Sequence, residues 1–151
     1  MSTTAATSPA ERAVRPAHRG DADAVFALLA QVGKPYSPDR PVFDVAFDEV
    51  IDSDDHLIWV VETDGVVIGY ALTTILRLLH TNGFSAQLQE LVVDVEARSS
   101  GSGSYLVSEI ERELTERGVK QLTVAIVRGA ASFYDRLGYR STADYLKKDL
   151  L

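Results

Sequence analysis

The sequence predicts an α/β protein of the α+β kind, with a mixed, largely antiparallel central sheet of six to seven strands and helices on both faces. Two patterns lead to this prediction. Runs rich in β-branched residues alternate with turn dipeptides such as Asn82-Gly83, which is typical of antiparallel hairpins. Elsewhere apolar residues recur every four positions, as Leu106, Ile110 and Leu114 do, which indicates amphipathic helices.

The elements follow one another in the order β-α-α-β-β-β-α-β-α-β. Residues 1–11 are small, polar and unpatterned, so we expect a disordered tail there and a single domain over 12–151. Asp21 is a suitable N-cap for the first helix, and Gly69 indicates a bulge in the third strand. The expected elements are strands at 13–17, 57–62, 66–76, 85–95, 121–127 and 139–149, and helices at 22–33, 42–51, from the glycine turn to 117, and from about 133 to 137.

Composition excludes several kinds of function. The chain has no cysteine, so disulfides, thiolate metal sites and a cysteine nucleophile are excluded, which suits a cytoplasmic protein. His18, His56 and His80 lack the spacing of metal ligands, so we expect no metal. No stretch resembles a membrane span or a secretory signal. The net charge of −7 argues against nucleic acid and favours a cationic substrate, such as a protonated amine.

A glycine-containing turn joins the strand at 85–95 to the long helix. The strand ends in an apolar run that predicts burial on both faces, formed by Leu91, Val92, Val93 and Val95. The turn itself spans 98–103, and the amphipathic helix follows directly. Such a turn presents several backbone N–H groups at the positive end of a helix dipole, so it predicts a phosphate or pyrophosphate site.

Three known motifs could account for this turn. A P-loop requires Lys after its last glycine, and Ser104 follows Gly103 here. A dinucleotide-binding fingerprint requires G-x-G-x-x-G early in the chain, and this turn lies two-thirds along it. The third is V-D-P-x-x-R-G-x-G-x-G/A, and residues 93–103 resemble it, with Val95 in place of Pro and Ser99 in place of the first Gly. That motif belongs to the GNAT superfamily of acyl-CoA-dependent N-acetyltransferases.

A second motif downstream strengthens the resemblance. Residues 130–139, AASFYDRLGY, are similar to the superfamily's closing motif A-x-x-F-Y-x-x-L-G-F. The two motifs cover roughly residues 85–140, and the order of elements extends the similarity over nearly the whole chain. The resemblance therefore implies a GNAT fold and acetyl-CoA as co-substrate.

The resemblance also implies which residues bind acetyl-CoA. Strand backbone at Leu91, Val92 and Val93 is expected to pair with the pantetheine arm. The pyrophosphate is expected to lie against main-chain N–H groups of Arg98, Ser99, Ser100, Gly101, Ser102, Gly103 and Ser104. Ser99 suits this role only if its backbone avoids positive φ. Val127 stands where the superfamily often has an Asn that contacts the pantetheine arm.

Two residues are candidates for acid–base chemistry. The resemblance gives Tyr134 the role of general acid, because a phenol with a pKa near ~10 stays protonated at neutral pH and can protonate a departing thiolate. Its alternative role is packing beside Phe133. Glu90 is the candidate base for the incoming ammonium, and its alternative is a surface or ion-paired position. Gln89 and Glu90 point to opposite faces of a regular strand, so one of them faces the substrate.

The resemblance therefore implies an N-acetyltransferase that moves an acetyl group from acetyl-CoA directly to a primary amine of a small molecule, with the loop at 34–41 near the acceptor. The competing readings are a non-catalytic acyl-CoA-binding or sensor domain and a protein or peptide N-acetyltransferase. The last expected strand leaves apolar residues at a sheet edge, so we also expect a homodimer. Neither nucleic acid nor membrane is expected as a partner.

Overall fold

The computed structural model describes residues 11–126 and 129–151. Its centre is a five-stranded sheet in the order β1-β2-β3-β4-β5, in which β4 and β5 are parallel and the other neighbours antiparallel. The strands are β1 Arg12–Pro16, β2 His56–Thr63, β3 Val66–Leu78, β4 Gly83–Val93 and β5 Leu122–Val124. The helices are α1 Ala22–Ala30, α2 Arg40–Asp52, α3 Ser102–Glu116 and α4 Ala131–Arg136, with short 3-10 turns η1 Arg19–Asp21 and η2 Val95–Ala97. The predicted fold class is confirmed.

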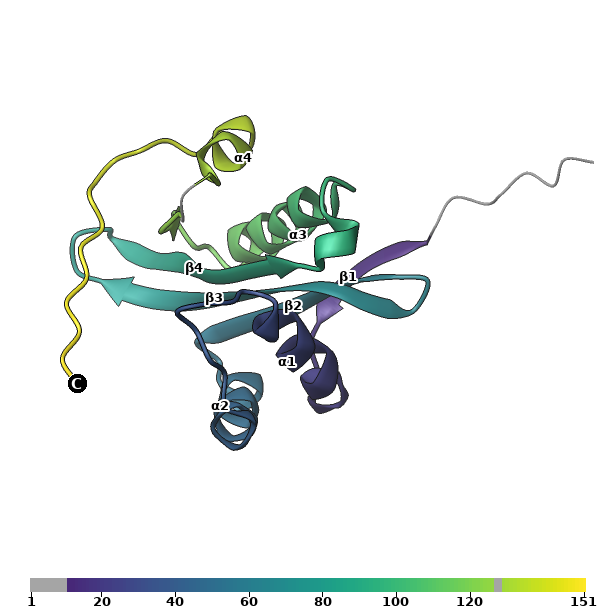
Figure 1. The fold of residues 1–151 in the computed structure, drawn as a ribbon. Helices are drawn as coiled ribbons and strands as arrows, with labels where there is room; N and C mark the ends of the chain where they lie inside the picture. The colour runs from purple at the N-terminus through teal and green to yellow at the C-terminus, as the bar shows by residue number, and fades with distance from the viewer. Residues whose placement is uncertain (1–10, 127–128) are drawn as a thin grey trace, which may run out of the picture.

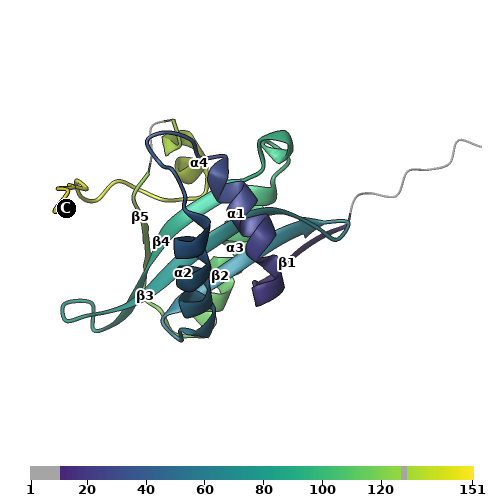
Figure 2. The ribbon, with the colours of Figure 1, turned by 60° about the horizontal axis from the view of Figure 1, so that its bottom comes forward.

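Helices cover both faces of the sheet. Figure 1 shows α3 and α4 on one face and α1 and α2 on the other, and Figure 2 shows α1 and α2 lying across the strands. A separate apolar cluster fills each interface. The α3 cluster includes Trp59, Val61, Leu88, Leu106, Ile110 and Tyr134, and the α1–α2 cluster includes Val25, Leu28, Phe47, Ile58, Val60 and Tyr70. The sheet therefore separates two environments, and the face to which a β4 side chain points decides which one it enters.

Local turn chemistry accounts for the meander β2–β3–β4. Asp64 and Gly65 both have positive φ between β2 and β3, as a tight Asp-Gly hairpin turn requires. The expected bulge also occurs, because the β2–β3 register shifts beside Gly69. A Cβ added at Gly69 would lie 2.9 Å from Val61 Cγ1, so the close approach of the two strands requires glycine.

The predicted last strand is absent. Residues 140–151 form no strand and make no backbone hydrogen bond to any other described residue. Tyr139 is fixed, because its N–H donates to Tyr134 O and its hydroxyl lies 3.3 Å from Glu111 Oε2. Beyond it the chain has little to pair with, since β5 is only three residues long instead of the seven expected at 121–127. The described sheet thus has five strands rather than six or seven.

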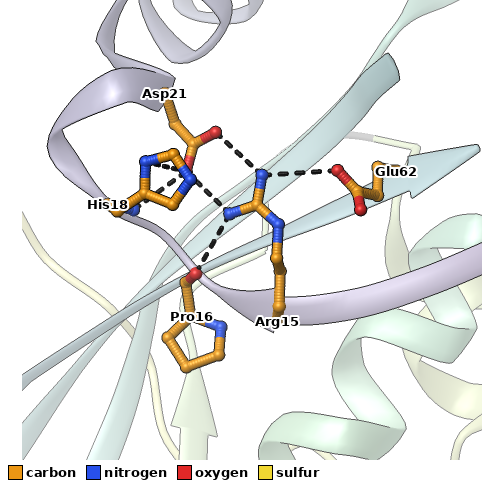
Figure 3. Close-up of polar contacts among 5 residues, drawn as sticks. All are labelled: Arg15, Pro16, His18, Asp21 and Glu62. Carbon is orange, nitrogen blue, oxygen red and sulfur yellow. Dashed lines mark hydrogen bonds and ion pairs between the residues drawn. The ribbon is translucent and has the colours of Figure 1, made fainter. Parts of the chain in front are cut away.

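Asp21 has a different role from the one predicted. It stands before α1, but its side chain makes no cap hydrogen bond. Instead its carboxylate accepts two hydrogen bonds from the guanidinium of Arg15, at 2.8 and 2.9 Å, and a third from the N–H of His18 (Figure 3). Glu62 lies on the other side of the same guanidinium, 3.3 Å away. The hydrogen bonds from Arg15 are the main reason that the pKa of Asp21 lies below its usual value.

Candidate active site

The outer edge of β4 is open over its second half. Strand β5 pairs only with Ala86, Gln87 and Leu88, whereas β3 pairs with β4 as far as Val93. The edge from Gln89 to Val93 therefore has no strand partner within the described parts of the chain. Unpaired N–H and C=O groups along a strand can bind an extended ligand as an added strand.

A bulge at the start of this open edge sets the direction of the following side chains. The β3–β4 register shifts between Leu72 and Thr73, and Gln89 is the extra residue opposite them. Beyond the bulge Leu91 packs on the α3 cluster and Val92 on the α1–α2 cluster. Glu90 shares the face of Val92, and so it points toward α1 and α2.

Glu90 is bound by a buried tyrosine. The hydroxyl of Tyr70, on β3, donates a hydrogen bond of 2.8 Å to Glu90 Oε1. Burial, and next the charge of Glu90, raise the pKa of Tyr70 well above its usual value. The phenol therefore remains a donor at neutral pH and orients one oxygen of the carboxylate.

The turn before α3 differs from the prediction at two positions. Strand β4 ends at Val93, because the Asp94 side chain accepts a hydrogen bond from Glu96 N–H and starts η2. Val95 is therefore exposed in η2 and not part of a strand buried on both faces, so that prediction is wrong. Ser99 has a φ of +67°, so it does not avoid the left-handed region as expected. A non-glycine residue costs about 1–2 kcal/mol there.

Contacts with other elements stabilise this turn. Arg12, on β1, donates a hydrogen bond of 2.7 Å from Nη2 to the carbonyl oxygen of Ser100. Within the turn, the hydroxyls of Ser100 and Ser102 form a hydrogen bond of 2.8 Å. Gln31, after α1, bonds to the carboxylate of Asp94 and accepts from the N–H of Val95. The strained turn is thus fixed from both faces of the sheet.

The N-terminus of α3 is available to an anion. Among the described residues no side chain caps this end, and Gly101 stands at the N-cap with a φ of +84°. The first N–H groups of a helix have no partner inside it, which here applies to Ser102, Gly103 and Ser104. Three adjacent donors at the positive end of a 15-residue helix fit a phosphate or pyrophosphate group. Arg98 adds a cation nearby, with Nε 3.5 Å from Val93 O.

Tyr134 lies on the opposite face of the sheet from Glu90. It belongs to the α3 cluster and is 8% exposed, with its ring 4.9 Å from that of Phe133 and 5.5 Å from that of Tyr139. Burial raises the pKa of Tyr134 above its usual value. The structure therefore does not bring the two acid–base candidates into contact. Glu90 lies in the open part of β4, and Phe133, the neighbour of Tyr134 on α4, flanks Gly103 together with Val93 at the end of that strand.

Sequence reasoning missed the residues that support these groups. Tyr70, Arg12 and Gln31 carry no motif, and each acts across 20 or more positions in the sequence. Strand alternation alone could have placed Tyr70 near β4. Val127, where the usual Asn is missing, lies outside the described residues. Residues 11–126 and 129–151 contain no cluster of side chains suited to a metal ion and no helix long and apolar enough to cross a membrane.

Comparison with known proteins identifies the family. The family model described as "Acetyltransferase (GNAT) domain" matches residues 54–141, more than half of the chain. The chain therefore belongs to the GNAT acetyltransferase family, a family of acyltransferases that use acetyl-CoA. The predicted resemblance is confirmed.

Individual relatives are more distant. A tRNA uridine(34) acetyltransferase of Methanocaldococcus infernus is 32% identical over 79 residues, which are 52% of this chain. The chain spans only 15% of the length of that relative.

Solved structures show the same fold at low identity. A transcriptional regulator from Bacillus halodurans C-125 matches with a TM-score of 0.84 and 22% identity, over 93% of this chain and 100% of that one. Glucosamine-6-phosphate N-acetyltransferase from Arabidopsis thaliana matches at 0.80 and 22%, over 93% and 99%. The aminoglycoside N-acetyltransferase AAC(6')-Iy, solved in complex with CoA, matches at 0.82 and 17%, over 95% and 97%.

Proposed function

We propose that this protein transfers an acetyl group from acetyl-CoA to the primary amine of a small molecule. The observation that carries the proposal is the open edge of β4 from Gln89 to Val93, which leads into the uncapped N-terminus of α3. One extended ligand with an amide-containing arm and a pyrophosphate can use both features. Family membership supports acetyl-CoA as that ligand.

Two segments of the chain bind two different parts of acetyl-CoA in this proposal. Backbone groups of Leu91, Val92 and Val93 pair with the pantetheine arm, and N–H groups of the turn from Arg98 to Ser104 bind the pyrophosphate. Acetyl-CoA supplies the acetyl group as a thioester. The whole sequence contains no cysteine, so transfer through an acyl-cysteine is excluded and direct attack by the amine remains.

Two side chains move protons in the proposed reaction. Glu90, with one oxygen bound by Tyr70, takes a proton from the ammonium, directly or through water. As the nitrogen–carbon bond forms and the carbon–sulfur bond breaks, Tyr134 gives its proton to the sulfur. The burial that raises its pKa keeps that proton in place at neutral pH.

A second candidate is a non-catalytic acyl-CoA-binding or sensor domain. The observation in its favour is that Glu90 and Tyr134 face opposite sides of the sheet. Protein or peptide acetylation is the other alternative. Both alternatives retain the binding of acyl-CoA.

Thiol release from acetyl-CoA separates the candidates. The purified full chain is incubated with acetyl-CoA and panels of small amines and of peptides, and CoA binding is measured in parallel by calorimetry. Turnover with a small amine supports the proposal. CoA binding without turnover on any acceptor favours the sensor, and turnover on peptides alone favours the protein acetyltransferase.

A matched pair of variants tests the pyrophosphate site. A Cβ added at Gly103 would lie 3.5 Å from Phe133 and 3.6 Å from Val93, in ordinary contact. Gly103→Asp and Gly103→Asn add side chains of equal size there, but only Asp adds negative charge beside the pyrophosphate. We expect CoA affinity at least about tenfold weaker for Asp than for Asn, or about 1.4 kcal/mol. Equal affinities in calorimetry would remove the turn from the binding site.

A further inference from the structure

A cleft between the sheet and the helices α1 and α2 opens beside Glu90. Its volume is about 270 Å³, and we call it the Glu90 cleft. It is lined by Val25, Leu29, Pro38, Asp39, Val42, Phe43, Ala46, Phe47, Val50, Ile58, Tyr70, Leu72 and Glu90. Its size lies just below the range of about 300–1,000 Å³ that is usual for drug-sized ligands, so a small molecule fits it.

The charge of the Glu90 cleft has one sign. Its only ionisable lining residues besides Tyr70 are Glu90 and Asp39, both acidic. The nearby cation does not neutralise them, because Arg40 lies 2.6 Å from Asp23 and 2.8 Å from Asp44. The guanidinium of Arg40 also lies over the ring of Phe26, 5.2 Å from its centre. Asp39 already accepts a hydrogen bond of 3.1 Å from the N–H of Val42 as the N-cap of α2, so Glu90 is the carboxylate left for a single positive charge.

The remaining walls are apolar. Phe43 and Phe47 stack at 5.3 Å and form the side given by α2, and Ile58 and Leu72 form the side given by the sheet. Apart from the two carboxylates and the hydroxyl of Tyr70, these walls offer few groups that could bind a hydroxyl-rich ligand. A ligand hydroxyl buried there without a hydrogen-bond partner weakens binding.

We infer that the acceptor is an amphipathic monoamine, with one ammonium group on a compact aromatic or branched aliphatic body. The ammonium lies beside Glu90 and the hydrocarbon body against Phe43 and Val42. The same chemistry disfavours amino sugars, whose hydroxyls meet apolar walls, and polyamines, whose further charges meet the same walls. This inference rests on the proposed acetyltransferase function and names its substrate class.

The substrate class is tested with four amines on the full chain. Steady-state thiol release is measured with 2-phenylethylamine, 3-methylbutylamine, glucosamine and spermidine, and the binding of each amine is measured by calorimetry with CoA present. We expect kcat/KM for 2-phenylethylamine to exceed that for glucosamine and for spermidine by at least tenfold. A preference for glucosamine or spermidine overturns the inference and leaves the acetyltransferase proposal intact.

The binding arm distinguishes failure of the inference from failure of the proposed function. Calorimetric binding of 2-phenylethylamine without any turnover supports the Glu90 cleft as its site and contradicts the acetyltransferase proposal. If the two apolar amines show neither turnover nor binding, the inference is overturned.

Helix α2 offers a matched pair of variants for locating the amine. Val42 lines the cleft and is 67% exposed, whereas Val45 is 62% exposed and does not line it. Val42→Ser removes apolar contact with the ligand. It is expected to weaken the binding of 2-phenylethylamine, so that Kd and KM rise about three- to tenfold. Val45→Ser is expected to change neither value. Equal effects of the two variants, with unchanged melting temperatures, overturn the assignment of the cleft.

Discussion

At the scale of single residues, Tyr134 decides whether the chain is an enzyme that uses a protonated phenol. Tyr134→Phe keeps the ring packed between Phe133 and Tyr139 and removes only the hydroxyl. If that hydroxyl protonates the thiolate, kcat falls about 10²- to 10⁴-fold while CoA affinity changes little. Steady-state thiol release on wild type and variant checks this.

The pH dependence of kcat is a second test of the role of Tyr134. Because burial raises the pKa of Tyr134, its proton remains available throughout the neutral and mildly alkaline range. Wild-type kcat should therefore show no loss from this group below about pH 10. Turnover of Tyr134→Phe within twofold of wild type would assign the proton to water or another side chain.

Ser99 stores strain that glycine would remove. Its φ of +67° costs about 1–2 kcal/mol, part of which glycine loses again through its greater freedom in the unfolded chain. We expect Ser99→Gly to stabilise the fold by about 0.5–1 kcal/mol, or about 1–4 °C in melting temperature. Ser100→Gly is the control, since it relieves no strain and removes a hydrogen bond to Ser102. A lower melting temperature for Ser99→Gly would contradict this account.

At the scale of elements, the ion pair between Arg15 and Asp21 joins β1 to η1, directly before α1. Asp21→Asn keeps the shape and removes the charge, which should cost about 1.5–3 kcal/mol in the free energy of unfolding at pH 7. Because the folded state lowers the pKa of Asp21, this contribution is complete above about pH 4 and is lost as the pH falls through the lowered pKa. Denaturant unfolding at pH 7 and pH 3 measures the difference.

An exposed carboxylate gives the control for that measurement. The Asp23 side chain, 90% exposed, pairs with Arg40 at the surface, so Asp23→Asn should change stability by less than about 1 kcal/mol. If Asp21→Asn is no more costly than Asp23→Asn at pH 7, the junction does not depend on this ion pair.

How much the sequence predicts depends on the range of the interactions involved. Asp64 and Gly65, and Asn82 before β4, adopt the positive φ that their residue types tolerate, and Gly118, with a φ of +78°, follows the end of α3. Such features depend only on neighbouring residues, so they can be predicted without the rest of the chain. The strand expected at 139–149 depends instead on a neighbouring edge, and the short β5 provides little of it.

The same distinction applies to the candidate site. The turn and the residues Tyr134 and Glu90 lie in local motifs, so the resemblance could name them. Their surroundings could not be predicted: the bulge at Gln89 decides which face Glu90 points to, and Tyr70 binds it from another strand. Ser99 shows the opposite error, because the turn imposes its conformation against the preference of the residue.

At the scale of the whole molecule, residues 140–151 support the proposed homodimer. Leu146 is 89% exposed, and Tyr145, Leu150 and Leu151 are exposed with it. We expect the segment to pair with a second copy of the chain, which would cover these side chains. Light scattering at micromolar concentrations should report a dimer, and Leu146→Lys should shift it toward monomer.

Leu79 provides the matched control for the dimer. It is also an exposed leucine but lies between β3 and β4, so Leu79→Lys should leave the dimer unchanged. A wild-type monomer under these conditions, or equal effects of both substitutions, would contradict the proposed interface.

The open edge of β4 has a consequence for the lifetime of the folded chain. Peptide groups from Gln89 to Val93 that lack a strand partner are expected to exchange their hydrogens early, and a bound pantetheine arm would protect them. At a ligand concentration of 100 times Kd, linkage adds about 2.7 kcal/mol to stability. Hydrogen exchange with and without CoA should show this protection first at residues 89–93. The supply of acetyl-CoA would then set how long each molecule survives proteolysis as well as how fast it works.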